Sequence, residues 1–94
     1  MTSGKANSPY RIAFSRPARR AYDRADRALR TRLDGCWRQI EHDPRGHANS
    51  QPLHGPLSGL WRYRLGDLRI VYQIDDEERI VTIAAIAQRG SVYD

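Results

Sequence analysis

Hydrophobic and polar positions along this chain follow two different periods, which predict strands at both ends and helices between them. Tyr10, Ile12 and Phe14 alternate with polar or small residues, a pattern typical of a short first strand. Helical spacing follows, first in a short segment and then in a longer one. The longer segment carries one apolar stripe at helical intervals, made of Leu29, Leu33, Cys36, Trp37 and Ile40.

Capping residues predict where these two helices begin and end. Ser15 supplies a hydroxyl cap for the first helix, and Pro17 fits its first turn, where a missing N–H costs nothing. Asp23 or Asp26 can cap the second helix. That helix should stop before Pro44 is reached, because the residue before a proline avoids the helical region. A polar loop is expected over residues 45–51.

Alternation returns in residues 60–65, within the segment 53–74, whose sequence is LHGPLSGLWRYRLGDLRIVYQI. Trp61, Tyr63 and Leu65 are expected on one face of a strand, with arginines on the other. Gly66-Asp67 predicts a two-residue hairpin turn, because glycine readily adopts the positive φ that such turns require. The segment is therefore expected to form two antiparallel strands.

This hairpin would bring three arginines together on one face of the sheet. If the strands pair directly across the turn, Arg64 lies opposite Arg69 and Arg62 is nearby. Like charges opposite each other destabilise a sheet, so the arrangement suits a protein that binds an anion there, with a phosphate ester the natural candidate. The alternative is that these arginines are solvated strand residues that offset an acidic turn at residues 75–78.

Residues 79–89 are apolar on both faces, as in a central strand. The expected order is β-α-α-β-β-β: an α+β fold with a two-helix hairpin packed on one face of an antiparallel sheet. Residues 1–8 are expected to be a flexible tail and residues 9–94 a single domain. With a four-residue turn before the last strand, Ala84 and Gln88 would share the face of Arg69; an odd turn or a bulge would place Arg89 there instead.

The charge of the chain indicates which kinds of partner it binds. The chain has a net charge of +5 and a pI near 10.0, and Lys5 is its only lysine among 16 basic residues. Arginine presents a planar fork of donors that matches phosphate and stacks on bases. Nucleic acid and an acidic protein are therefore the expected partners.

Other chemistries find no support in the sequence. The single cysteine, Cys36, is interpreted as a small buried hydrophobe within a helix. His42, His47 and His54 lack partners at metal-ligand spacing, so neither a metal nor another cofactor is expected, although His54 remains a minor candidate for substrate contact. No apolar run is long enough to span a membrane, and a cytoplasmic location is expected.

Residues 10–93 resemble the RelE/ParE superfamily of toxins from bacterial toxin–antitoxin pairs in length, element order and motifs. The most specific part is the pattern L-x-G-x-L-x-G-L-W-R-x-R-x-G-D-x-R-x-x-Y-x-I, which residues 53–74 fill. Ribosome-dependent endoribonucleases of the RelE kind and gyrase-poisoning toxins of the ParE kind share this pattern. The end of the chain favours the RelE branch, because RelE-like enzymes similarly place a tyrosine a few residues after an arginine, as Tyr93 follows Arg89 here.

The resemblance implies roles for individual residues. Arg69 and Arg89 fall on arginines that stabilise the scissile phosphate, and Tyr93 on a tyrosine that stacks on the substrate base or takes part in proton transfer. Arg62 and Arg64 fall on basic positions that are commonly lysine in RelE-type enzymes. The candidate catalytic residues are therefore Arg64, Arg69, Arg89 and Tyr93, and the candidate RNA-binding residues are Arg62, Arg64 and His54.

The implied activity is cleavage of mRNA in the ribosomal A site, by attack of a ribose 2′-OH on the adjacent phosphodiester. The alternatives are a non-enzymatic inhibitor of DNA gyrase and a degenerate toxin that retains only antitoxin binding and operator control. Under all three hypotheses a RelB-like antitoxin is the expected partner, and it is expected to bind the helix pair and the edges of the sheet. Operator DNA is expected to be bound only through the antitoxin complex. The ribosome and mRNA are partners under the first hypothesis alone.

Overall fold

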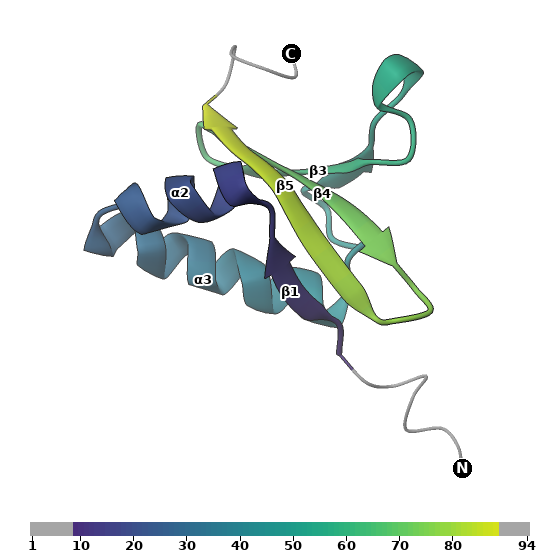
Figure 1. The fold of residues 1–94 in the computed structure, drawn as a ribbon, viewed down its shortest axis with the longest axis horizontal. Helices are drawn as coiled ribbons and strands as arrows, with labels where there is room; N and C mark the ends of the chain where they lie inside the picture. Colours follow the sequence, from purple (N-terminus) through teal and green to yellow (C-terminus); the bar gives the residue numbers. More distant parts are fainter. Residues whose placement is uncertain (1–8, 89–94) are drawn as a thin grey trace.

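The computed structural model describes residues 9–88, and it places two helices on one face of a five-stranded sheet (Figure 1). In chain order the elements are β1 (Arg11–Phe14), α2 (Arg16–Arg24), α3 (Arg27–His42), β2 (Ser50–Pro52), the 3-10 helix η1 (Gly55–Leu57), β3 (Trp61–Leu65), β4 (Leu68–Asp75) and β5 (Ile80–Gln88). The α+β class and the helix pair on one face are confirmed. Within the described range, no helix is long and apolar enough to cross a membrane.

Both predicted helix starts are confirmed by cap hydrogen bonds. The Ser15 hydroxyl accepts from the backbone N–H of Ala18 at 3.2 Å, and Asp26, rather than Asp23, accepts from Leu29 at 2.9 Å. These bonds satisfy N–H groups that have no partner within the first turn of a helix. Helix α3 ends at His42, before Pro44 as predicted.

One pair of strands corrects the expectation of a wholly antiparallel sheet. The strand order is β1-β5-β4-β3-β2, and β1 runs parallel to β5 while the other neighbours are antiparallel. The helix pair carries the chain away from β1, and β5 later enters between β1 and β4, so these two strands are distant in sequence. Hydrophobic alternation predicts which face of a strand is buried, but it does not predict the direction of a neighbour that is remote in the chain.

A fifth strand corrects the expected loop over residues 45–51. Strand β2 pairs with β3 at the sheet edge, with Ser50 opposite Tyr63, Gln51 opposite Arg62 and Pro52 opposite Trp61. It is too short to show an alternating pattern, and a proline is tolerated at an edge because the missing N–H is not needed by a neighbour. The pairing extends the sheet beyond the predicted hairpin.

A β-bulge in β5 decides between the two registers that the sequence left open. The pairing shifts between Val71 and Tyr72, which face Ala85 and Ile83, so Ala84 is the extra residue. The Ser15 hydroxyl donates to the Ala84 carbonyl at 2.7 Å and so satisfies a group that the bulge takes out of the ladder. Beyond the bulge Ala87, rather than Ala84 or Gln88, lies opposite Arg69.

The core lies between α3 and the sheet. The stripe predicted on α3 is buried at Leu33, Cys36, Trp37 and Ile40. Cys36 is 2% exposed, which confirms its interpretation as a buried hydrophobe, and burial raises the pKa of its thiol to about 12. From the sheet side, the buried Tyr72 hydroxyl donates to the Pro44 carbonyl at 2.6 Å and thereby fixes the segment that leads from α3 to β2.

Candidate functional site

The three arginines of the β3–β4 hairpin lie on the sheet face that is turned away from the helices. Leu65 pairs with Leu68 across the turn, so Arg64 lies directly opposite Arg69 and Arg62 opposite Val71, as predicted. Residues that alternate with them, such as Tyr63 and Ile70, are buried in the core with the helices. We call the surface formed by Arg62, Arg64 and Arg69 the arginine face.

Arg62 is held by a neighbouring side chain on the edge strand. Its Nη2 donates to the Oε1 atom of Gln51, its partner on the edge strand β2. Burial and the neighbouring charges of Arg64 and Arg69 lower the pKa of Arg62. The guanidinium stays protonated at any usable pH. The lowered pKa therefore reflects burial first, and then a repulsion by Arg64 and Arg69 that a bound anion would relieve.

A polar depression adjoins Arg62 and Arg64 at the sheet edge. It has a volume of about 190 Å³ and is lined by Ala48, Asn49, Gln51, Arg62 and Arg64. Its residues come from β3, β2 and the segment before β2, so the edge strand creates it. Two positive side chains and two carboxamides in a hollow of this size suit one nucleotide unit.

The sheet next to Arg69 carries small side chains. Arg69 lies between Arg64 on β3 and Ala87 on β5, and Ala85 is the next residue of β5 on the same face. The bulge produces this arrangement, because it selects which alternate residues of β5 share the face.

The other predicted site residues lie apart from this cluster or outside the described chain. His54 is exposed on the loop between β2 and β3, just before η1, and is not among the residues that line the depression. Arg89 and Tyr93 lie outside residues 9–88. The described site therefore consists of the arginine face and its depression.

Two residues of the depression, Asn49 and Gln51, were missed by sequence reasoning. Both fall in the segment that was expected to be a loop, and short polar stretches carry no periodicity that could place them on a face. Pro52 was the available signal, since a proline next to polar residues is compatible with an edge strand.

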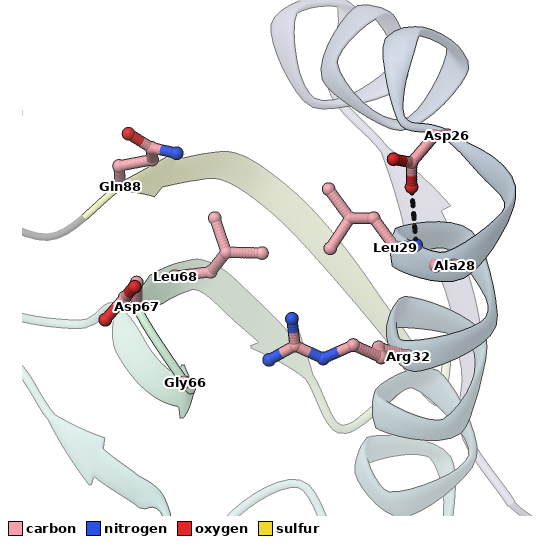
Figure 2. A pocket seen from close by; sticks show the side chains of 8 residues that line it. All are labelled: Asp26, Ala28, Leu29, Arg32, Gly66, Asp67, Leu68 and Gln88. Atoms are coloured by element: carbon pink, nitrogen blue, oxygen red, sulfur yellow. Dashed lines mark hydrogen bonds between the residues drawn. The ribbon is translucent and has the colours of Figure 1, made fainter.

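A second hollow lies on the opposite side of the hairpin, between the start of α3 and the β3–β4 turn (Figure 2). It has a volume of about 440 Å³ and is lined by Asp26, Ala28, Leu29, Arg32, Gly66, Asp67, Leu68 and Gln88. Figure 2 shows Leu29 and Leu68 directed toward each other across it, with the Arg32 guanidinium reaching toward the turn. We call this hollow the hairpin groove.

Within the described residues, neither hollow contains a thiol or a cluster of metal-binding side chains. The one thiol, Cys36, is buried in the core. Among residues 9–88, no group of three or more His, Cys, Asp or Glu side chains is placed to hold a metal ion. The polar chemistry of the described site is thus that of guanidinium and carboxamide groups.

Comparison with known proteins identifies relatives over most of the chain. The sequence profile of the family described as "ParE toxin of type II toxin-antitoxin system, parDE" matches residues 9–93. Toxin RelE of Mycobacterium tuberculosis is 33% identical over 86 residues, which cover 90% of this chain and 87% of that protein. Toxin RelG of the same organism is 29% identical over 86 residues, covering 90% of this chain and 97% of that protein.

The fold is also that of a chain in a solved toxin–antitoxin complex. The toxin–antitoxin complex RelBE2 from Mycobacterium tuberculosis contains a chain with a TM-score of 0.75 and 27% identity, covering 86% of this chain and 99% of that one. The sequence and the fold are thus both similar to proteins of toxin–antitoxin systems.

Proposed function

This chain belongs to the ParE toxin family of type II toxin–antitoxin systems. Within that family, we propose that it is a RelE-like endoribonuclease that cleaves mRNA in the ribosomal A site. The observation that carries the proposal is the arginine face, where Arg64 and Arg69 are opposed on neighbouring strands. Such a pair is unfavourable without an anion between its members. The named relatives RelE and RelG support the RelE branch over the ParE branch.

The proposed reaction is an internal transfer within the RNA. The ribose 2′-oxygen forms a bond to the adjacent phosphorus and loses its proton, while the bond from phosphorus to the 5′-oxygen breaks and that oxygen gains a proton. The products are a 2′,3′-cyclic phosphate and a 5′-OH end. The nucleophile belongs to the substrate, so the reaction requires neither a nucleophilic side chain nor a metal ion from the protein.

The arginines would act by stabilising charge. The phosphorane carries more negative charge than the phosphodiester, so guanidinium groups fixed on the sheet bind the transition state better than the substrate. Arg64 and Arg69 are proposed to contact the phosphate, and Arg62 the neighbouring RNA. Arg89 is included because the family resemblance places it on an arginine that stabilises the scissile phosphate.

Tyr93 and His54 complete the proposed site. Tyr93 is proposed to stack on the substrate base or to transfer a proton, as the family resemblance implies. His54 is retained as a peripheral RNA contact, because it is exposed on the loop that precedes β3. A ribosomal substrate would place the protein in the cytoplasm.

The test is mRNA cleavage in a cell-free translation reaction, with the RNA ends identified chemically. Cleavage should leave cyclic phosphate and 5′-OH ends, and Arg69→Ala should lower the rate about 100-fold, the loss typical of removing one donor to a developing oxyanion. Gln73→Ala is the matched control, because Gln73 is an exposed residue of β4 on the same face but outside the depression. Undiminished cleavage by Arg69→Ala would overturn the proposed role.

Because the matching family is described as a ParE toxin, the alternative function is inhibition of DNA gyrase. Such a protein would arrest growth through DNA damage and leave mRNA intact. Removing residues 91–94 separates the two functions, since the ribonuclease should lose activity with Tyr93 and a gyrase inhibitor should keep its toxicity.

We also propose that the hairpin groove binds an acidic, amphipathic segment of an antitoxin. The groove offers two leucines for an apolar side chain and the exposed Arg32 for a carboxylate, while its Asp26 and Asp67 carboxylates would accept from donor groups of the same segment. The net charge of +5 favours an acidic partner. The structural relative RelBE2 is itself a toxin–antitoxin complex.

Charge reversal tests the groove. Arg32→Glu should weaken binding of the antitoxin encoded beside this gene by about tenfold, as measured by titration calorimetry. Arg38→Glu reverses a charge at another exposed position of α3, outside the groove, and should weaken binding much less. Equal losses in the two variants would argue for attraction by overall charge rather than docking in the groove.

A further inference from the structure

A histidine side chain closes the turn that leads into β2. The Nδ1 atom of His47 accepts a hydrogen bond from the backbone N–H of Asn49 at 3.1 Å, and the His47 carbonyl accepts one from the N–H of Ser50 at 2.9 Å. Because the N–H of Asn49 donates, Nδ1 carries no proton, and the proton of the neutral ring is on Nε2. Asparagine and aspartate side chains bind the N–H two residues ahead in the same way. His47 thus supplies, from a ring nitrogen, the acceptor that an Asx turn takes from an oxygen.

The core holds the His47 ring in the orientation that this hydrogen bond needs. The ring lies against the ring of Tyr63, with the two centroids 5.1 Å apart and the planes inclined by 35°. Tyr63 is itself only 4% exposed and belongs to the hydrophobic core. A close-packed neighbour of this kind restricts the rotation of a side chain. His47 therefore connects the core to the turn through one ring.

The turn in turn sets the wall of the depression beside the arginine face. Ala48 and Asn49 line the depression, and the Asn49 carbonyl accepts from the Arg64 N–H at 3.1 Å, where the pairing of β2 with β3 begins. Two residues further along, Gln51 lies opposite Arg62, and its Oε1 atom accepts from the Arg62 guanidinium. The place of the turn therefore determines where Gln51 holds Arg62.

We propose that His47 is a positioning residue of the arginine face: its Nδ1 atom fixes the turn, the turn places Gln51, and Gln51 directs the Arg62 guanidinium. His47 is not among the residues that line the depression, so it acts through its neighbours rather than by touching RNA. The effect on cleavage rests on the proposed ribonuclease function, whereas the effect on Arg62 does not.

Two substitutions separate the ring nitrogen from the ring. His47→Asn keeps an acceptor that reaches the N–H two residues ahead, but it removes the ring. His47→Phe keeps an aromatic ring against Tyr63, but it has no acceptor. A residue that served only to pack against Tyr63 would tolerate phenylalanine and not asparagine. A residue that positions the turn through Nδ1 should tolerate asparagine and not phenylalanine.

The kinetics of mRNA cleavage on translating ribosomes test this difference. Arg62 is proposed to contact RNA beside the cleaved phosphate, so its misplacement should remove binding energy that substrate and transition state share. His47→Phe should therefore raise KM about tenfold with little change in kcat, and His47→Asn should stay within about twofold of the wild type. A general loss of folded protein would instead lower kcat at an unchanged KM. His42→Phe is the matched control, because His42 is an exposed residue at the end of α3, outside the depression.

A measurement on the protein alone separates this inference from the proposed function. The Arg62 side-chain N–H signals in an NMR spectrum should shift or broaden in His47→Phe and stay near their wild-type positions in His47→Asn. His47→Leu, which also lacks an acceptor, should repeat the result of His47→Phe. Wild-type signals and KM in His47→Phe, or equal changes in the asparagine and phenylalanine variants, would overturn the inference and leave the ribonuclease assignment standing. If the wild-type protein cuts no mRNA, the ribonuclease assignment fails, and the NMR comparison alone decides the role of His47.

Discussion

Arg64 and Arg69 lie opposite each other on neighbouring strands, where like charges repel. Arg62 shares this repulsion, since its pKa is lowered by burial and by both neighbours. A protein selected only for stability would gain from a neutral residue at one of these positions. The repulsion among these arginines lowers the stability of the fold, as is expected of residues that are kept in order to bind an anion.

Replacing one of these charges should separate stability from activity. Arg64→Gln is expected to raise the free energy of unfolding by about 0.3–1 kcal/mol, because it removes a like-charge pair, and to lower RNA cleavage about tenfold or more. Chemical denaturation and the cleavage assay measure the two effects. Arg38→Gln, at an exposed position of α3, should change neither by a comparable amount. A destabilised Arg64→Gln variant would contradict the electrostatic argument.

Asp76 provides a second prediction at this scale, which concerns pH. The side chain of Arg45 makes two hydrogen bonds to Asp76, at 2.9 and 3.0 Å, and the Tyr10 hydroxyl donates a third at 2.6 Å. These bonds hold the pKa of Asp76 below its ordinary value of 3.8. A carboxyl whose pKa is lower in the folded state stabilises the protein above its unfolded pKa, and this contribution is lost as the pH falls through the folded pKa.

The Asp76→Asn variant tests this linkage. It should be less stable than the wild type at neutral pH, and the difference should shrink as the pH falls below 3.8. Denaturant titrations of both proteins at a series of pH values measure the difference. A gap that stays constant down to the lowest pH would show that the carboxylate charge plays no part.

The elements of this fold differ in how well their sequences predict them. The capped helices and the β3–β4 hairpin were predictable, because Ser15, Asp26 and the Gly66-Asp67 turn act through local chemistry. The edge strand β2 and the bulge in β5 were not, because both depend on residues that are distant in the chain. Asn49 and Gln51 in the depression were not predicted for the same reason, since they acquire their places only when β2 pairs with β3.

Replacing a glycine by alanine should have opposite effects on stability in the β3–β4 turn and in helix α3. Gly66 has a φ of +59°, a left-handed conformation that residues with a Cβ atom adopt at a cost, so Gly66→Ala should cost about 1–2 kcal/mol of stability. An added Cβ would lie 2.5 Å from Arg32 Nη2, but this exposed side chain can move away. Gly35 lies inside α3 with no atom within 4 Å of an added Cβ, so Gly35→Ala should stabilise by up to about 1 kcal/mol. Thermal unfolding of the two variants measures both signs. A loss from both substitutions would contradict this account of the turn and of the helix.

At the scale of the whole molecule, the arginine face and the hairpin groove lie on opposite sides of the sheet. A partner held only in the groove would leave the arginines open to substrate. An antitoxin that blocks cleavage must therefore pass around the β3–β4 turn or the edge formed by β2. The groove would then act as an anchor, and inhibition would require a second contact on the arginine face.

The central claim concerns the ribosome, and mapping mRNA ends with and without ribosomes tests it most directly. Purified protein is added to a translating cell-free reaction and, separately, to the same mRNA without ribosomes, and new 5′ ends are sequenced. The account predicts cuts at fixed positions within the codons of translated mRNA and few or none without ribosomes, because alignment of the 2′-OH with the phosphate is left largely to the ribosome. Equal cleavage of free mRNA would contradict ribosome dependence, and intact mRNA in the translating reaction would contradict the ribonuclease assignment itself.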